Sequence, residues 1–206
     1  MNETAASRIQ FSSSPPPGWM ELFSHACGSC AACTSGWSAW CECPAVSQPL
    51  CFVPETLGLP RASRLLMAVS AFMSATVNDD AIVVAAVTSG DETLVDLLRL
   101  VHWGSVFAAN DLRDAALKKQ LLALTRTGRA DVIVSLDGGR DAVMAVKRGG
   151  TVCLPEAVLN MPTITELAQR EVRMVGPRDM AALVDKVGRH SVEMAFARRR
   201  SESLLT

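Results

Sequence analysis

The stretch Ala81-Ile-Val-Val-Ala-Ala-Val87 decides the fold of this chain. Seven apolar residues in succession predict a strand that is buried on both faces, as the strands of parallel sheets are. Residues 91–102 follow with apolar side chains at helical spacing, so a helix is expected directly after the strand. A strand that feeds a helix in this way is the start of a strand–helix–strand crossover.

The same alternation continues to residue 188. Further strands are predicted at residues 105–109, 131–135, 150–154 and 172–175, and further helices at residues 112–127, 139–148, 162–170 and 178–188. Strands joined by helices through short connections form right-handed crossovers and a parallel sheet with helices on both faces. The sequence therefore predicts an α/β protein with a Rossmann-like doubly wound parallel sheet over residues 79–188, in which the first strand is central.

Four closely spaced cysteines form the second informative feature of the sequence. They follow the pattern C-x2-C-x2-C-x7-C and are Cys27, Cys30, Cys33 and Cys41. Four thiolates suit a tetrahedral zinc ion, and a site closed by four cysteines is structural rather than catalytic. Disulfides or unliganded thiols are the alternatives, but cysteines this close in sequence seldom bridge, and the chain's total of seven is odd. The pattern thus predicts a small zinc lobe.

Composition divides the remainder of the chain. Residues 1–18 end in a Ser- and Pro-rich run, which predicts a flexible arm. Residues 19–78 contain the four cysteines and an apolar stretch at residues 57–77 that is expected to be helical. Residues 189–206 include three consecutive arginines and are expected to form a C-terminal tail.

The cysteine segment carries a resemblance to a known family. The stretch from His25 to Cys41 resembles the structural-zinc lobe of the medium-chain zinc-containing alcohol dehydrogenases, which also has a glycine after the first ligand, as Gly28 is here. Residues 130–139, 147–154 and 171–176 are similar, in the same order, to segments of that family's nucleotide-binding domain. The resemblance implies a truncated, degenerate relative of NAD(P)-dependent oxidoreductases, with residues 19–78 holding the zinc lobe and a remnant of the catalytic domain.

The turn that binds the dinucleotide in that family is altered here. Alignment places the glycines of G-x-G-x-x-G on Ala86, Thr88 and Asp91. Glycines let the backbone approach a pyrophosphate at a helix N-terminus, whereas Thr88 adds a Cβ and Asp91 adds a repelling carboxylate. Asp111 stands where the resemblance places the acid that binds the ribose, although it would also serve as the cap of a helix starting at Leu112. Weak or absent NAD(P) binding is expected.

The catalytic zinc of the family also lacks its ligands in this sequence. Such an ion needs a coordination position that is open to substrate. The residues before Cys27 contain no cysteine and one histidine, and residues 67–72, where the resemblance places a final ligand, read Met-Ala-Val-Ser-Ala-Phe. His102 is expected to lie at a helix end and His190 in the tail. No catalytic residue is therefore expected.

Charge and hydropathy exclude two classes of partner. The net charge is −1, from 20 basic and 21 acidic residues, which argues against a nucleic-acid surface. The longest apolar run, residues 81–87, is too short to cross a membrane. A zinc-type cysteine cluster with no recognisable export signal predicts a cytoplasmic protein.

Three functional readings follow from these observations. The first is a catalytically impaired alcohol-dehydrogenase-like protein that binds structural zinc and acts as a structural or interaction subunit, either in a homo-oligomer or in a larger assembly. The second is a working NAD(P)-dependent oxidoreductase with altered contacts, the missing catalytic half coming from another chain. The third is an unrelated α/β protein whose zinc knuckle binds a protein partner.

Overall fold

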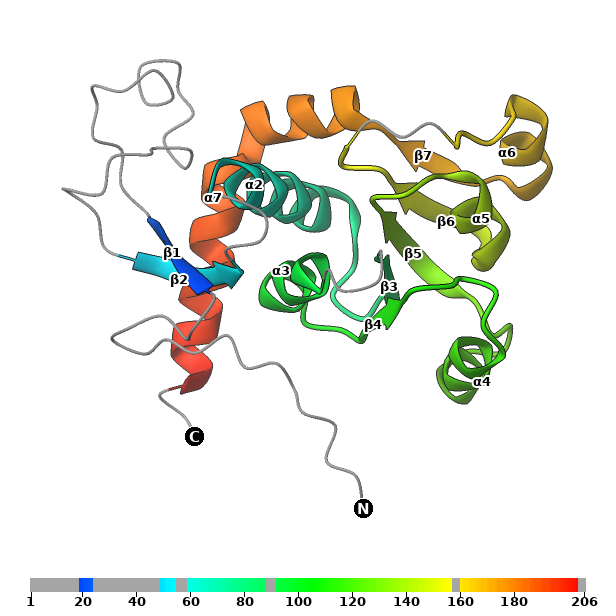
Figure 1. Ribbon diagram of the computed structural model, residues 1–206, viewed down its shortest axis with the longest axis horizontal. Coiled ribbons are helices and arrows are strands. Elements are labelled where there is room, and N and C mark those ends of the chain that lie inside the picture. Colours follow the sequence, from blue (N-terminus) through cyan, green and yellow to red (C-terminus); the bar gives the residue numbers. More distant parts are fainter. Residues whose placement is uncertain (1–18, 24–48, 55–58, 88–91, 157–159, 204–206) are drawn as a thin grey trace.

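A computed structural model describes residues 19–23, 49–54, 59–87, 92–156 and 160–203 of the chain. Its main body is a parallel sheet with helices on both faces, which confirms the α/β class and the doubly wound, Rossmann-like arrangement (Figure 1). No helix in these ranges is both long enough and apolar enough to cross a membrane.

Five parallel strands make up the sheet. They are β3 (Val83–Ala86), β4 (Val106–Ala109), β5 (Ala130–Ser135), β6 (Val146–Cys153) and β7 (Arg173–Val175), in the order β4-β3-β5-β6-β7. Val84 lies opposite Phe107 on one side and Ile133 on the other, so β3 is hydrogen-bonded along both edges. The first strand is therefore an interior strand, as expected, although it is not the middle one of the five. The middle strand is β5, because the described residues place only β4 on the far side of β3.

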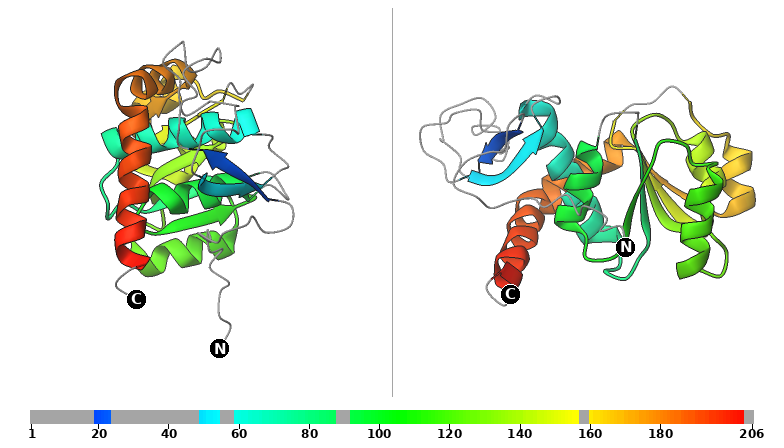
Figure 2. Two further views of the ribbon diagram at one scale, coloured as in Figure 1. Left: turned by 90° about the vertical axis from the view of Figure 1, so that its left-hand side faces the viewer. Right: turned by 60° about the horizontal axis from the view of Figure 1, so that its bottom comes forward.

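The helices divide between the two faces of the sheet (Figures 1 and 2). One face carries α2 (Leu59–Thr76), α3 (Thr93–Val101) and α7 (Pro177–Ser203), and the other carries α4 (Ala115–Leu124), α5 (Arg140–Ala145) and α6 (Ile164–Arg170). The chain runs from β3 outward to β4 and then back past β3 to β5. Right-handed crossovers in opposite directions put their helices on opposite faces, which explains why α3 and α4 are separated by the sheet.

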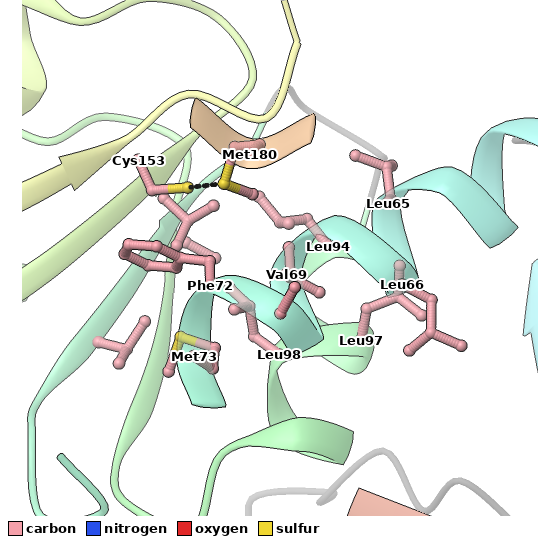
Figure 3. Packing of buried hydrophobic residues seen from close by; sticks show 14 of the residues in the cluster. Leu65, Leu66, Val69, Phe72, Met73, Leu94, Leu97, Leu98, Cys153 and Met180 are labelled. Carbon is pink, nitrogen blue, oxygen red and sulfur yellow. Dashed lines mark hydrogen bonds between the residues drawn. The ribbon is translucent and has the colours of Figure 1, made fainter. Parts of the chain in front are cut away.

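The larger core lies between the sheet and the face formed by α2, α3 and α7 (Figure 3). Phe72 of α2 and Leu94 and Leu98 of α3 are fully buried there. On its sheet side, the Cys153 Sγ approaches the Met180 Sδ of α7 to 3.5 Å. Removing a Leu- or Phe-sized side chain from water contributes about 1.5–3 kcal/mol, so this layer is a main source of the stability of the domain.

Residues 189–203, expected to form part of a C-terminal tail, continue helix α7 in the structure. The helix continues to Ser203 because Val192 and Ala195, three residues apart, remain buried beside α2. Val192 also belongs to the larger core. A helix that repeats apolar residues at this spacing keeps one face on its neighbour and leaves its charged residues to solvent.

Two other boundaries differ from the sequence-based expectation. Helix α4 begins at Ala115, not at Leu112, because the Asp114 carboxylate accepts a hydrogen bond of 2.8 Å from the backbone N–H of Ala116. Strand β6 begins at Val146, ahead of the expected residue 150, and it follows the last residue of α5 directly. After the buried Val146, residues 147–149 are exposed and include two cationic side chains, so the sequence pattern did not indicate a strand.

A separate antiparallel pair precedes the parallel sheet. Strand β1 (Trp19–Phe23) pairs with β2 (Pro49–Pro54), with Met20 opposite Val53. The four cysteines predicted to bind zinc, Cys27, Cys30, Cys33 and Cys41, lie between these strands and outside the described residues. The zinc lobe and the flexible arm at residues 1–18 therefore stay predictions.

Candidate functional site

Between the neighbouring strands β3 and β5, the direction of the connections reverses: β3 is followed by β4 on one side, and β5 is followed by β6 on the other. The connection after β3 leads to α3 on one face, and the connection after β5 leads to α5 on the other. In open α/β sheets, ligands bind outside the carboxyl ends of the strands at this switch point. The carboxyl ends of β3 and β5 are therefore the candidate functional site, and the altered cofactor residues predicted from the sequence follow β3 and β4 at this edge.

The described residues show only part of the altered turn. Ala86 is the last residue of β3, and its methyl group is buried on the face of the sheet that carries α4, α5 and α6. Thr88, Gly90 and Asp91 lie outside the described residues. The roles assigned to Thr88 and Asp91 as degenerate cofactor-binding positions therefore remain predictions.

The first turn of α3 is rich in negative charge. Glu92 occupies the N-cap position and is exposed, while Asp96 lies in the first turn and is only 5% exposed. Acidic side chains at a helix N-terminus stabilise that helix by complementing its dipole. Negative charge here also works against binding of an anion at this helix N-terminus, where the dipole alone would attract one. Glu92 and Asp96 were not among the predicted site residues, although acidic residues shortly after a predicted strand could have indicated an acidic helix N-terminus.

Asp111 lies where β4 gives way to α4, near the carboxyl edge of the sheet. It is exposed, and its Oδ1 accepts a hydrogen bond of 2.8 Å from the backbone N–H of Arg113. This contact forms a local Asx turn. The N-cap of α4 is Asp114 instead, so the alternative reading of Asp111 as a helix cap was wrong.

An exposed ion pair lies beside Asp111. The Arg113 guanidinium and the Asp141 carboxylate approach to 2.5 Å, which joins the start of α4 to the first turn of α5. Hydrogen bonding and attraction from Asp141 raise the pKa of Arg113 above its ordinary value. Both side chains are well exposed, so the pair orients the two connections but adds little to stability.

A cavity of about 270 Å³ runs between α4 and α5, below this ion pair. Val84 and Ile133 of the sheet contribute to its lining, with Leu117 and Leu121 of α4 beside them, and Arg113 and Asp141 are also among its lining residues. Neither this cavity nor the ion pair was foreseen from the sequence, because both depend on where α4 and α5 lie over the sheet.

The loop after β5 contains two glycines that are explained by packing. A Cβ added at Gly138 would lie 2.8 Å from the Cβ of Asn160, and the N–H of Gly139 donates a hydrogen bond of 2.7 Å to the Asn160 carbonyl. These glycines therefore allow residues 160–162 to pack closely against the loop. Their role is structural within the described chain.

The positions considered for a catalytic metal serve the fold instead. Met67 and Phe72 are buried in the larger core. His102 is also buried, with its Nε2 2.8 Å from the carbonyl oxygen of Ala81. His190 is exposed on α7 and does not lie in a tail. Over the ranges that the structure describes, no three His, Cys, Asp or Glu side chains are grouped to hold a metal ion.

Comparison with known proteins gives structural similarities only. The sequence matches no protein-family model and no curated protein. Among solved structures, the D-arabinose dehydrogenase from Sulfolobus solfataricus aligns with a TM-score of 0.42 and 12% identity, over 82% of this chain and 69% of that one. An alcohol dehydrogenase superfamily protein from Novosphingobium aromaticivorans aligns with a TM-score of 0.42 and 19% identity, over 76% of this chain and 54% of that one. The alcohol dehydrogenase from Aeropyrum pernix aligns with a TM-score of 0.39 and 16% identity, over 84% of this chain and 66% of that one.

These solved structures are oxidoreductases of the alcohol-dehydrogenase type, and one further match, rspB from Escherichia coli CFT073, was crystallised with NADH. The chain spans 48% to 69% of the length of the first three structures it matches. At TM-scores below 0.5 and identities below 20%, the similarities assign no activity, substrate or cofactor to this chain.

Proposed function

We propose that this chain is a catalytically impaired relative of the medium-chain zinc-containing alcohol dehydrogenases that acts as a structural or interaction subunit. The ordered sequence resemblances support the ancestry. The observation that supports weak dinucleotide binding is the acidic start of α3, with Glu92 at its N-cap and Asp96 in its first turn.

The charge argument can be given a magnitude. Two like charges about 4 Å apart repel by about 1 kcal/mol in water and by about 4 kcal/mol at the effective dielectric constant near a protein surface. Asp96 is largely buried, so water screens its charge less than that of Glu92. A dinucleotide would meet this repulsion in place of the attraction that a free helix N-terminus supplies. This repulsion supports the proposal that NAD(P) binds weakly or not at all.

Alcohol oxidation in the resembled family also needs a Lewis acid that polarises the substrate oxygen. The segment at residues 67–72 would have to supply one of its ligands, but Met67 and Phe72 pack in the core. A ligand at either position would have to leave a fully packed layer. We therefore place no catalytic residue in the described part of the chain.

An interaction role requires surfaces that a partner can use. Strands β4 and β7 lie at the two edges of the parallel sheet, and their outer backbone groups are available for pairing within the described structure. The exposed Leu122 and Leu124 of α4 and Met144 of α5 add apolar area on one face. A homo-oligomer or a larger assembly, with structural zinc held by the four clustered cysteines, is the form we propose for a cytoplasmic protein.

Asp111 favours a second candidate, an NAD(P)-dependent oxidoreductase with altered contacts. Asp111 is exposed after β4 and does not cap α4, which supports the proposal that its carboxylate recognises a ribose hydroxyl. This candidate would need the dinucleotide phosphates to bind without the helix N-terminus.

Titration calorimetry with NADH and NADPH, run beside elemental analysis for zinc, separates the two candidates. We expect no dissociation constant tighter than the millimolar range for the unmodified chain. Glu92→Gln should strengthen binding slightly by removing one repelling charge, whereas Asp185→Asn, a matched change on the exposed side of α7, should not. A micromolar constant for the unmodified protein would overturn the proposal and support the oxidoreductase.

A further inference from the structure

A second cavity lies at the opposite edge of the sheet from the candidate functional site, near the amino ends of β3 and β4. Its volume is about 480 Å³, within the range of sites that hold small molecules. It is formed by the end of α2, the end of α3 and the later part of α7. We propose that this cavity binds a small, uncharged polyol, such as a sugar or sugar alcohol.

The first observation is a buried hydroxyl that has no partner. Ser70 of α2 lines the cavity and is 3% exposed, and its Oγ makes no hydrogen bond. Thr76, six residues later in the same helix, instead donates its hydroxyl to the carbonyl of Phe72 at 2.6 Å. The helix therefore offers local acceptors to a hydroxyl, and Ser70 does not use one. A buried hydroxyl without a partner lowers stability, and a ligand hydroxyl at this wall would satisfy it.

The second observation is the mixture of polar groups and apolar walls around Ser70. Asn78 and His190 line the cavity with exposed side chains that can both donate and accept hydrogen bonds. Trp103 and Met194 also line it and are 39% and 42% exposed, which leaves large apolar surfaces facing the hollow. A polyol presents hydroxyl groups to the first set and carbon–hydrogen faces to the second.

Charge selects an uncharged ligand over an anion. The described lining residues include no lysine or arginine and one carboxylate, that of Asp79. A phosphate or carboxylate ligand would meet no lysine or arginine in this lining and would be repelled by Asp79. A small organic cation, which Asp79 and the Trp103 ring could attract, is the alternative that the experiment must exclude.

Saturation-transfer NMR and titration calorimetry on the full chain test the proposal with three probes: a sugar alcohol such as ribitol, choline, and inorganic phosphate. We expect ribitol to bind in the millimolar range and the other two probes to give no saturable signal. Ser70→Ala should weaken ribitol binding at least about tenfold while the melting temperature of the unliganded protein stays the same or rises, because it removes an unsatisfied hydroxyl.

Two further variants keep the test decisive. Asn78→Ala changes an exposed cavity residue and should also weaken ribitol binding, so the proposal does not depend on Ser70→Ala folding normally. Ser105→Ala, an exposed serine outside the cavity lining, should leave binding unchanged. Absence of ribitol binding, binding of choline or phosphate alone, or unchanged ribitol affinity in both cavity variants would each overturn the proposal.

Discussion

Replacing Phe72 with alanine should destabilise the domain strongly, although the family resemblance places this residue near a metal ligand. Phe72 is 0% exposed and belongs to the core between α2, α3, α7 and the sheet. Burial of its ring contributes about 1.5–3 kcal/mol, and the cavity left by truncation raises the total cost to about 3–5 kcal/mol. A domain of this size has about 5–15 kcal/mol in all, so the variant should lose a large share of its stability.

Urea unfolding followed by far-ultraviolet circular dichroism measures this loss as a lower midpoint with an unchanged slope. Leu122→Ala is the matched control, because Leu122 is half exposed on α4 and its truncation should change the free energy of unfolding by less than about 0.5 kcal/mol. Phe72→Asp should be worse than Phe72→Ala, since it buries an unpaired carboxylate. A cost below about 1 kcal/mol for Phe72→Ala would refute the assignment of this segment to the core.

Four further outcomes are expected. Carefully reduced protein should contain one zinc ion per chain, and serine at any of the four clustered cysteines should abolish zinc binding while leaving the circular dichroism of the parallel sheet largely intact; a disulfide among the four would contradict this. Thr88→Gly combined with Asp91→Gly should strengthen NADH binding in calorimetry without producing alcohol oxidation, and equal affinity for variant and parent would count against the ancestral geometry. Thr163→Ala removes the capping box of α6, so the free energy of unfolding should fall by about 1 kcal/mol at neutral pH in urea titrations. Hydrogen bonds from Thr163 lower the pKa of Glu166, and the contribution of the Glu166 carboxylate to stability is therefore complete above its ordinary pKa of 4.5. This contribution should be lost as pH falls through the lowered pKa in the parent protein, and the loss should be absent from Glu166→Gln. Burial raises the pKa of Cys153, so mass spectrometry should find its thiol unmodified by iodoacetamide at pH 8 until urea unfolds the chain, and rapid labelling of the native protein would disprove its burial.

Strands β3, β4 and β5 could be predicted because each contains a run of apolar residues. The helix boundaries that were predicted wrongly depend on details, such as which of two aspartates caps a helix, that the hydrophobic pattern does not determine. Asp111 and Asp114 are both suitable helix caps, and only the structure shows that the Asp114 carboxylate accepts a hydrogen bond from the backbone N–H of Ala116 in the first turn of α4. Helix α7 looked like a charged tail because Arg198, Arg199 and Arg200 obscure the apolar spacing before them.

The candidate sites were less predictable than the strands. Asp111 and the altered turn could be found because they follow strands at fixed distances in sequence. The cavity beside Ser70 could not, since its walls come from α2 and α7, which are far apart in the chain. Nothing in the sequence around Ser70 distinguishes it from a serine that bonds to its own helix, so its significance appears only when the neighbouring helices are in place.

The position of α7 has a consequence for how the protein is made. This helix covers α2, but it leaves the ribosome only after every strand of the sheet has been synthesised. Until then the apolar side of α2 has no α7 to pack against, and growing chains with exposed apolar surface are prone to associate with one another. Synthesis at roughly 5–20 residues per second leaves this surface open for several seconds. A nascent chain stalled before residue 177 should therefore recruit chaperones, whereas one extended to residue 203 and clear of the exit tunnel should release them.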